Sequence, residues 1–281
     1  MLLCGKKVKK KTKMVHKNIS ILGCGWLGLP LAKALIATHF SVKGSTTSFD
    51  KLATLEENKI QPFLLSLNEN EIIGNIDDFL EASEVLIIDV PPKLRGNCSE
   101  NFVAKIKTLI PFIEKSSVTK VLFVSSTSVY ADDNLIVTEQ TIPKPQTEGG
   151  KQLLEAEKLL QNNKKFQTTI LRFGGLIGED RHPIKFIAGR ENLENPDAAI
   201  NLIHQKDCIG IILKIIETNS WNEIFNAVAP FHPTRETYYT QKAIESNLVL
   251  PKFNTEKPSI GKVISSEKII EVLDYTFQIL A

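Results

Sequence analysis

The sequence has no run of 18 apolar residues, and so no segment is long enough to cross a bilayer as a helix. Its four cysteines (Cys4, Cys24, Cys98 and Cys208) are far apart, without a CxxC pair or a Cys/His cluster at zinc-binding spacing. These absences predict a soluble, cytoplasmic protein with reduced thiols, no membrane partner and no metal site. Nothing in the sequence indicates an oligomeric state.

Basic charge is confined to the N-terminus. Residues 1–17 hold seven lysines and no acid, whereas the remaining chain has 27 basic and 32 acidic residues. A nucleic-acid-binding surface gathers Lys and Arg on one face, and so we expect no nucleic-acid partner. Residues 1–17 lack the apolar stretch of a signal peptide and the arginines of a transit peptide. We expect a disordered extension there, with a basic targeting arm as the alternative.

From Ile19 onward, short β-branched runs alternate with longer amphipathic stretches, a pattern typical of βαβ units and a parallel sheet. We expect six parallel strands, at residues 19–22, 41–44, 63–67, 85–90, 121–125 and 169–173. We expect helices at residues 27–38, 49–57, 99–115 and 150–162 on both faces of the sheet. The predicted fold class is α/β, a Rossmann-type doubly wound parallel sheet with a small C-terminal α/β lobe.

The C-terminal part of the chain has a looser order of elements. We assign residues 18–175 to the Rossmann core and residues 176–281 to a smaller lobe interleaved with it. Helices are expected at residues 207–218, 234–246 and 266–280, forming this lobe over the carboxyl ends of the strands.

A glycine-rich sequence, Gly23-Cys24-Gly25-Trp26-Leu27-Gly28, joins the first expected strand to the first helix. Gly23 permits a tight turn, Gly25 lets the backbone approach a pyrophosphate, and Gly28 lets the helix pack closely on the strand. The helix N-terminus then faces the phosphates. The loop, with Trp26 and Leu27, therefore predicts an NAD(P) site, although a purely structural turn is the alternative.

The second strand has no Asp or Glu where an NAD enzyme would bind the ribose 2′-hydroxyl. Ser45, Thr46 and Thr47 stand there instead, with Lys51 nearby, and these groups can hydrogen-bond a 2′-phosphate. We therefore expect NADP as the preferred cofactor, with NAD as the second choice. An ordinary polar loop is the alternative.

Two further segments are expected to border the cofactor. Val90, Pro91 and Pro92 end a buried strand and are expected to form a wall beside the adenine and pyrophosphate, unless the prolines only stop the strand. Gly174 and Gly175 follow the last expected strand, where their backbone amides would meet the nicotinamide carboxamide. A simple turn is the alternative for these two glycines.

The segment Val121 to Tyr130, which contains Ser125-Ser126-x-x-Val-Tyr130, is followed by Glu139 and a helix bearing Glu157. This order resembles the extended short-chain dehydrogenase/reductase superfamily, the NAD-dependent epimerase/dehydratase group, from about Ile19 to Leu280. The resemblance implies an oxidoreductase or epimerase-like enzyme acting on a small polar or sugar-nucleotide-like substrate. It also implies that Ser125 borders the cofactor and that Ser126 hydrogen-bonds the reacting substrate oxygen.

The same resemblance implies a Tyr-x-x-x-Lys pair on the following helix, at positions that here hold Gly149 and Leu153. Neither residue can act as the general acid or base that the tyrosine provides. This loss is similar to that of atypical superfamily members. Whether the chain is an enzyme therefore stays open, and the alternatives are a non-catalytic NADP(H)-binding redox sensor or regulator and a scaffold that binds no nucleotide.

If chemistry survives, another acid must stand near the nicotinamide, and the candidates by position are Tyr130, Glu148, His182 and His204. Arg181 and His182 are expected to contact a phosphate or carboxylate of the substrate, with a solvated surface pair as the alternative.

Two sets of residues are expected to have structural roles. His204 is also expected to hold the loop before Asp207, and Asp207 to N-cap a helix that begins at Cys208. The Tyr-x-x-x-Lys sequence from Tyr238 to Lys242 lies about a hundred residues after the serine strand, and we expect it to be structural.

Overall fold

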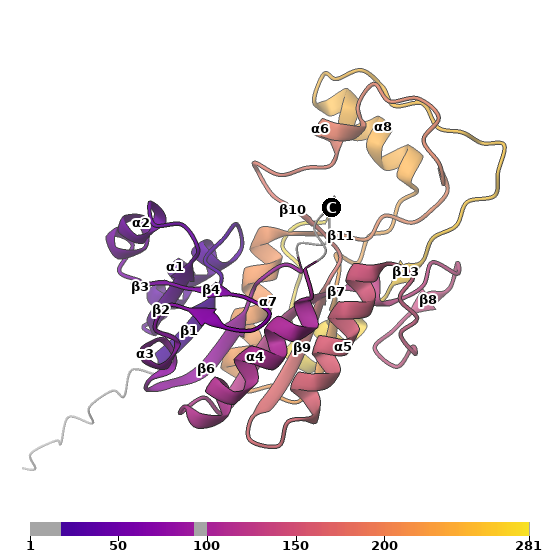
Figure 1. Cartoon of the computed structure of the whole chain (residues 1–281). Helices are drawn as coiled ribbons and strands as arrows, with labels where there is room; N and C mark the ends of the chain where they lie inside the picture. The colour runs from indigo at the N-terminus through magenta and orange to yellow at the C-terminus, as the bar shows by residue number, and fades with distance from the viewer. Residues whose placement is uncertain (1–17, 93–99, 281) are drawn as a thin grey trace, which may run out of the picture.

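A computed structural model describes residues 18–92 and 100–280 (Figure 1); the expected N-terminal extension lies outside this range. The main strands are β1 (Asn18–Leu22), β2 (Ser41–Thr46), β3 (Gln61–Leu64), β6 (Ser83–Ile88), β7 (Lys120–Ser126), β9 (Gln167–Phe173) and β12 (Ile224–Ala227). They form one parallel seven-stranded sheet in the order β12-β9-β7-β6-β1-β2-β3. The predicted doubly wound α/β fold is confirmed, and all six expected strands are present.

Helices cover both faces of this sheet (Figure 1). They are α1 (Gly28–Ala37), α2 (Lys51–Glu57), α3 (Ile76–Leu80), α4 (Phe102–Lys115), α5 (Glu148–Asn162), α6 (Ile184–Ile187), α7 (Gln205–Thr218), α8 (Arg235–Glu245) and α9 (Glu267–Leu273). Short strand pairs join β4 (Ser66–Leu67) to β5 (Ile72–Ile73), β8 (Ile136–Val137) to β13 (Val263–Ile264) and β10 (Gly175–Ile177) to β11 (Leu202–His204).

The sheet is buried on both faces, and for this reason its strands read as continuous apolar runs in the sequence. In β6, Val85 and Ile87 join the cluster under α1 and α7, whereas Leu86 and Ile88 join the cluster under α4 and α5. Burying apolar surface on both sides of the same strand gives the sheet the largest share of the hydrophobic stabilisation.

Two of the three C-terminal helices belong to the core, and so the expectation that all three form the smaller lobe is wrong for α7 and α9. Helix α7 packs against α1, and α9 packs against α7 and β12. Their side chains, among them Ile211 and Leu273, lie in the same hydrophobic cluster as β1. An amphipathic pattern shows that a helix buries one face, but it does not identify the surface that covers that face.

The seventh strand, β12, was not expected from the sequence. It has four residues and includes a buried asparagine, Asn226, which interrupts the apolar run that would have identified a strand. Helices α6 and α8 form a smaller unit beyond the carboxyl ends of the strands (Figure 1). Its separate hydrophobic cluster includes Ile184, Tyr238 and Tyr239.

A buried ion pair joins β9 to α5. The Arg172 guanidinium donates to both carboxylate oxygens of Glu157, at 3.0 Å from Nε and 2.5 Å from Nη2, and both side chains are almost fully buried. Arg172 Nη1 also donates to the Tyr130 hydroxyl at 2.6 Å, and that hydroxyl donates to Asn226 Oδ1 at 3.0 Å. The network therefore ties β9, β12, α5 and the segment after β7 together.

We expect Arg172→Met to lower the free energy of unfolding by about 3–5 kcal/mol, because it leaves the Glu157 carboxylate buried without a cation. The double variant Glu157→Leu/Arg172→Met should recover most of this loss, since it removes both charges. Urea unfolding measures both effects. A single variant that costs less than about 1 kcal/mol would mean that the pair does not hold β9 to α5.

Candidate functional site

The loop between β1 and α1 lies at the point where the strand order reverses, since β1 has β2 on one side and β6 on the other. In open α/β sheets this is where ligands bind, beyond the carboxyl ends of the strands. Gly23 has φ +108°, and a Cβ there would lie 2.3 Å from the Asp89 carbonyl oxygen. A Cβ at Gly28 would lie 2.2 Å from the Gly23 carbonyl oxygen. The chain itself therefore requires glycine at both positions.

Gly25 differs from these two glycines. A Cβ added to it would meet no atom of the described residues within 4 Å, and so packing within this part of the chain does not explain its lack of a side chain. A side chain would instead project into the open space beside the loop. Gly25 thus leaves the approach to the loop backbone clear, which is the role that a dinucleotide-binding loop gives its middle glycine.

The loop also presents free backbone donors. Ser45 accepts from the first two loop amides, through Oγ for Gly23 at 2.9 Å and through its carbonyl oxygen for Cys24 at 2.7 Å. No hydrogen bond within the described part of the chain uses the N–H of Trp26 or Leu27. Unpaired N–H groups at the start of a helix, with the helix dipole behind them, form an anion site.

A cavity of about 240 Å³ adjoins the loop. It is enclosed by the glycine loop, the end of β2, the segment around β4 and the residues that follow β6. Among the residues that line it are Gly23, Cys24, Gly25, Ser45, Thr46, Thr47, Lys51, Asp89, Val90, Pro91, Glu100 and Lys105. Most of the residues expected to bind the adenosine half of a dinucleotide are therefore brought together, whereas Pro92 is not part of the lining.

The hydroxyl groups at the end of β2 are unequal. Ser45 Oγ accepts from the Gly23 N–H and Thr46 Oγ1 accepts from the Ser48 N–H at 3.1 Å, and so both oxygens hold the turns of the chain. Thr47 and Lys51 are exposed and line the cavity. Of the groups expected to meet a 2′-phosphate, these two are the ones that the fold leaves available.

Trp26 connects the glycine loop to the loop after β10 through side-chain contacts. Its indole Nε1 donates to Asp180 Oδ1 at 2.9 Å, and the Arg181 guanidinium lies 5.0 Å from the ring centroid. The Gln205 side chain donates to the Trp26 carbonyl oxygen at 2.7 Å. A Cβ at Gly178 would lie 2.8 Å from the indole, which is therefore tightly packed.

This arrangement places the exposed Arg181 beside the glycine loop, on the face of the Trp26 ring. Asp180 is a site residue that sequence reasoning missed. The hydrogen bond from the Trp26 indole lowers the pKa of Asp180. No sequence signal links the two residues, because 154 positions separate them.

Ser126 lies at the end of β7, as the resemblance implied, but the tyrosine and lysine implied for α5 are absent. Ser126 Oγ accepts from the Ser128 N–H at 3.1 Å and keeps its own proton to donate. At the place of the absent tyrosine, a Cβ on Gly149 would meet no described atom within 4 Å, and Leu153 is buried in the core. Among the described residues, no tyrosine or lysine takes up these two positions.

Two of the expected site residues face the core. Ser125 Oγ donates to Glu157 Oε1 at 2.6 Å, away from the cavity. Tyr130 is 2% exposed, and its hydroxyl is held by Arg172 and Asn226. Burial raises the pKa of Tyr130. Both side chains belong to the buried network that supports the strand ends, which does not agree with cofactor binding by Ser125 or proton transfer by Tyr130.

The remaining acid candidates are held by neighbours. His182 Nδ1 accepts from the Ile184 N–H and Nε2 contacts the Tyr238 hydroxyl at 2.9 Å; burial lowers the pKa of His182. Glu148 is exposed and accepts from Gln152 at 2.9 Å. Lys242 pairs with Glu245 at 3.1 Å and its ammonium lies 5.7 Å from the Tyr238 ring centroid, and so these contacts stay on α8.

The expected N-cap of α7 was assigned to the wrong residue. The helix begins at Gln205, and His204 is its N-cap, with Nδ1 accepting from the Lys206 N–H at 3.1 Å. Asp207 is fully buried and instead accepts from the Tyr275 hydroxyl and from two backbone amides of the C-terminal segment. A carboxylate near a helix start fits either role in the sequence, and only the packing of the C-terminus decides between them.

Gly174 and Gly175 do not offer the backbone donors that we expected. The Gly174 N–H donates to the Ala227 carbonyl at 3.1 Å, and the Gly175 N–H donates to the Asn201 carbonyl at 2.8 Å. A Cβ at Gly174 would lie 2.5 Å from the Asn201 carbonyl oxygen, and one at Gly175 would lie 2.6 Å from the Leu202 side chain. Their small size serves the close packing of β10 on β11.

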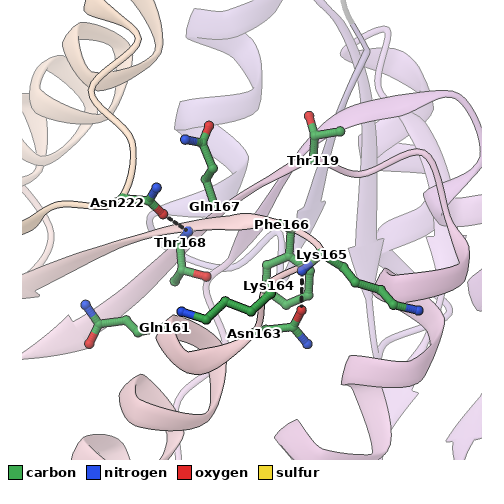
Figure 2. Close-up of a pocket in the computed structure, with 9 residues that line it drawn as sticks. All are labelled: Thr119, Gln161, Asn163, Lys164, Lys165, Phe166, Gln167, Thr168 and Asn222. Carbon is green, nitrogen blue, oxygen red and sulfur yellow. Dashed lines mark hydrogen bonds between the residues drawn. The ribbon is translucent and has the colours of Figure 1, made fainter.

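A second cavity, of about 450 Å³, lies near the amino ends of β7 and β9 (Figure 2). Its polar groups largely hold turns: Asn222 Oδ1 accepts from the Thr168 N–H, and Asn163 Oδ1 accepts from the Lys165 N–H. The glycine loop follows the carboxyl end of β1, at the opposite edge of the sheet, and so this cavity is separate from the candidate site.

Two further features are absent from the described residues. These residues contain no group of three or more His, Cys, Asp or Glu side chains arranged to hold a metal ion. No helix of residues 18–92 and 100–280 combines the length and apolar character that crossing a bilayer requires.

Comparison with solved structures defines the class of fold. The UDP-glucuronic acid 4-epimerase from Bacillus cereus, in complex with NAD, aligns with a TM-score of 0.78 at 18% identity, covering 93% of this chain and 92% of that one. A short-chain dehydrogenase/reductase superfamily protein from Agrobacterium tumefaciens with bound NAD aligns with a TM-score of 0.75 at 16% identity, covering 93% of both chains. The fold is that of the extended short-chain dehydrogenase/reductases, the epimerase/dehydratase group.

Sequence comparison then gives the family. Protein YeeZ from Escherichia coli (strain K12) is 34% identical over 265 residues, which cover 93% of this chain and 96% of YeeZ. The chain belongs to the same family as Protein YeeZ. No protein-family profile matches the sequence.

Gly25→Ala and Gly28→Ala should separate a ligand-facing glycine from a structural one. We expect Gly25→Ala to change the unfolding free energy by less than about 1 kcal/mol, because its Cβ enters open space. Gly28→Ala should cost about 1–3 kcal/mol or more, since its Cβ meets the Gly23 carbonyl. Thermal unfolding of the two variants tests this order, and equal losses would contradict it.

Proposed function

We propose that the chain is an NAD(P)-binding protein of the epimerase/dehydratase type, acting on a small polar or sugar-nucleotide-like substrate. The observation that carries the proposal is the cavity beside a glycine loop whose Trp26 and Leu27 amides are unpaired. The bound nicotinamide supplies or accepts a hydride at its C4. The residues of the chain bind and orient the dinucleotide.

The two similar structures support a dinucleotide ligand, since the descriptions of both name bound NAD. The pyrophosphate would lie at the Trp26 and Leu27 N–H groups, with Gly25 leaving room for it. Val90 and Pro91 would form one wall of the adenosine half. Arg181, held on the Trp26 ring, is near enough to this loop to meet a phosphate of the substrate.

NADP is the preferred cofactor in this proposal. Thr47 and Lys51 are exposed at the end of β2 and line the cavity, and the end of β2 carries no acid that would repel a 2′-phosphate. A cation near a phosphate forms a charge-assisted hydrogen bond, which is stronger than a neutral one.

A second candidate function is a non-catalytic NADP(H)-binding sensor or regulator. It is favoured by the positions of Gly149 and Leu153, which leave no tyrosine and lysine on α5 facing the serine strand. The Tyr130 hydroxyl does not replace the missing group, since Arg172 and Asn226 already hold it. Turnover, measured directly, decides between this function and the enzyme.

Titration with NADPH and with NADH, followed through Trp26 fluorescence in a Trp221→Phe background, tests the dinucleotide site. We expect saturable quenching by both, with tighter binding of NADPH. Lys51→Ala should weaken NADPH about tenfold, equivalent to about 1.4 kcal/mol, and leave NADH almost unchanged. If Lys51→Ala weakens NADPH and NADH equally, Lys51 does not contact the 2′-phosphate, and the dinucleotide site itself is not contradicted.

Gly25→Asp serves as the blocked control, because its carboxylate enters the space expected for the pyrophosphate. We expect it to abolish quenching by both dinucleotides while the protein stays folded by circular dichroism. If neither dinucleotide binds to the parent protein, the proposed function is wrong and the glycine loop is architectural.

The choice between enzyme and sensor depends on Ser126. With a panel of UDP-sugars and added NAD(P), the enzyme should give a product by mass spectrometry, and Ser126→Ala should lower the rate by about 10²-fold or more without changing the dinucleotide Kd. A protein that binds the dinucleotide and gives no product with any sugar nucleotide favours the sensor.

A further inference from the structure

Asp89 is an acid that the function described above does not use. It follows β6, lines the cavity at the glycine loop, and has Oδ2 3.2 Å from the position of a Cβ on Gly28. Its carboxylate therefore lies against the first turn of α1, next to the two amides expected to bind the pyrophosphate. Burial raises the pKa of Asp89 to about 7, although the backbone N–H of Gly28 acts in the opposite direction.

No charged group of the described residues forms an ion pair with the Asp89 carboxylate. Of the two acids that line the cavity, Glu100 pairs with Lys105 at 2.5 Å, whereas no ion pair within the described residues reaches Asp89. Lys51, at the start of α2, also lines the cavity.

The charge of Asp89 acts on two thiols of other elements, Cys24 in the glycine loop and Cys208 on α7. Burial raises the pKa of Cys24 to about 12 and that of Cys208 well above its usual range. Both thiols stay neutral between pH 6 and 9. Arg181, which acts on Cys208, is held on the Trp26 ring.

We propose that Asp89 takes up one proton from solvent when a dinucleotide binds, so that binding weakens as the pH rises; this inference rests on the dinucleotide site proposed above. The pyrophosphate brings two negative charges to the amides of Trp26 and Leu27, immediately before Gly28. A nearby negative charge disfavours the ionised form of a carboxyl group. The neutral carboxyl group removes the repulsion.

The direction of the pH dependence follows from linkage. The free protein loses the Asp89 proton near neutral pH, and the complex loses it at a higher pH. Below the pKa of Asp89 in the free protein and in the complex, the dinucleotide affinity does not change with pH. Between them the affinity falls by up to tenfold per pH unit, because each binding event must then take up a proton.

NADH is the probe for this test, since the 2′-phosphate of NADPH itself titrates near pH 6. We expect the NADH Kd, followed by Trp26 quenching from pH 6 to 9, to be flat near pH 6 and to rise by up to tenfold per unit above pH 7. Calorimetry at pH 8, in two buffers of different ionisation enthalpy, should show uptake of close to one proton per NADH bound.

Asp89→Asn should bind NADH with a pH-independent Kd, at least as tight at pH 8 as that of the parent protein, and without proton uptake. The amide has the shape of the carboxyl group and keeps an oxygen for the Gly28 N–H. Glu100→Gln, which changes the other acid of the cavity, should keep the pH dependence.

NADH binding that is independent of pH and takes up no proton would overturn this inference and leave the dinucleotide function standing. A pH dependence that persists in Asp89→Asn would also overturn it, because another group would then carry the proton. Absence of NADH binding at every pH would overturn the proposed function together with the inference. If Asp89→Asn does not fold, the calorimetry on the parent protein decides.

Discussion

The first turn of α1 packs so closely on the turns after β1 and β6 that no side chain fits at Gly23 or Gly28. This contact sets the direction of α1, and with it the direction of the free amides at the helix start. It also places Asp89 against that helix start, because the Asp89 carbonyl is the atom that a side chain on Gly23 would meet. The cavity, the free amides and the position of the half-buried Asp89 all depend on the same close approach.

Two sets of interactions hold the surroundings of this contact in place. On one side, Trp26 joins the glycine loop to Asp180 and Arg181, so that a loop from the C-terminal half closes against a loop from the N-terminal half. On the other side, the Glu157–Arg172 pair and the Tyr130 hydroxyl connect the ends of three strands to α5. Within the described residues, the buried Nδ2 of Asn226 has no hydrogen-bond partner, whereas the Arg172, Glu157 and Tyr130 side chains are hydrogen-bonded to one another or to Asn226 Oδ1. Losing one of these bonded groups would leave a further buried polar group unsatisfied, which is costly.

The chain has the glycine loop expected of a dinucleotide site and lacks the Tyr-x-x-x-Lys pair that the resemblance to extended short-chain dehydrogenase/reductases implies. Several polar groups that could have compensated have structural partners instead: Tyr130 in the network, His204 at the α7 N-terminus and His182 beside Tyr238. The free amides and the adjoining cavity therefore support the proposed dinucleotide binding, whereas the proposed catalysis depends on Ser126 alone among the expected groups.

Local periodicity and residue identity in the sequence predicted six of the seven strands of the main sheet, the position of the glycine loop and the absence of the tyrosine and lysine. The sequence did not identify β12, whose four residues include a buried asparagine, or the core location of α7 and α9. It also predicted free donors at Gly174 and Gly175 and a cap at Asp207, which the structure assigns to packing and to the C-terminal segment. Packing of the folded chain determines which hydroxyls and amides are already hydrogen-bonded, and it brings Asp180 to Trp26 and Asp89 to Gly28. The physical reason is that hydrogen-bond satisfaction and burial arise between residues far apart in sequence, and no local pattern records them.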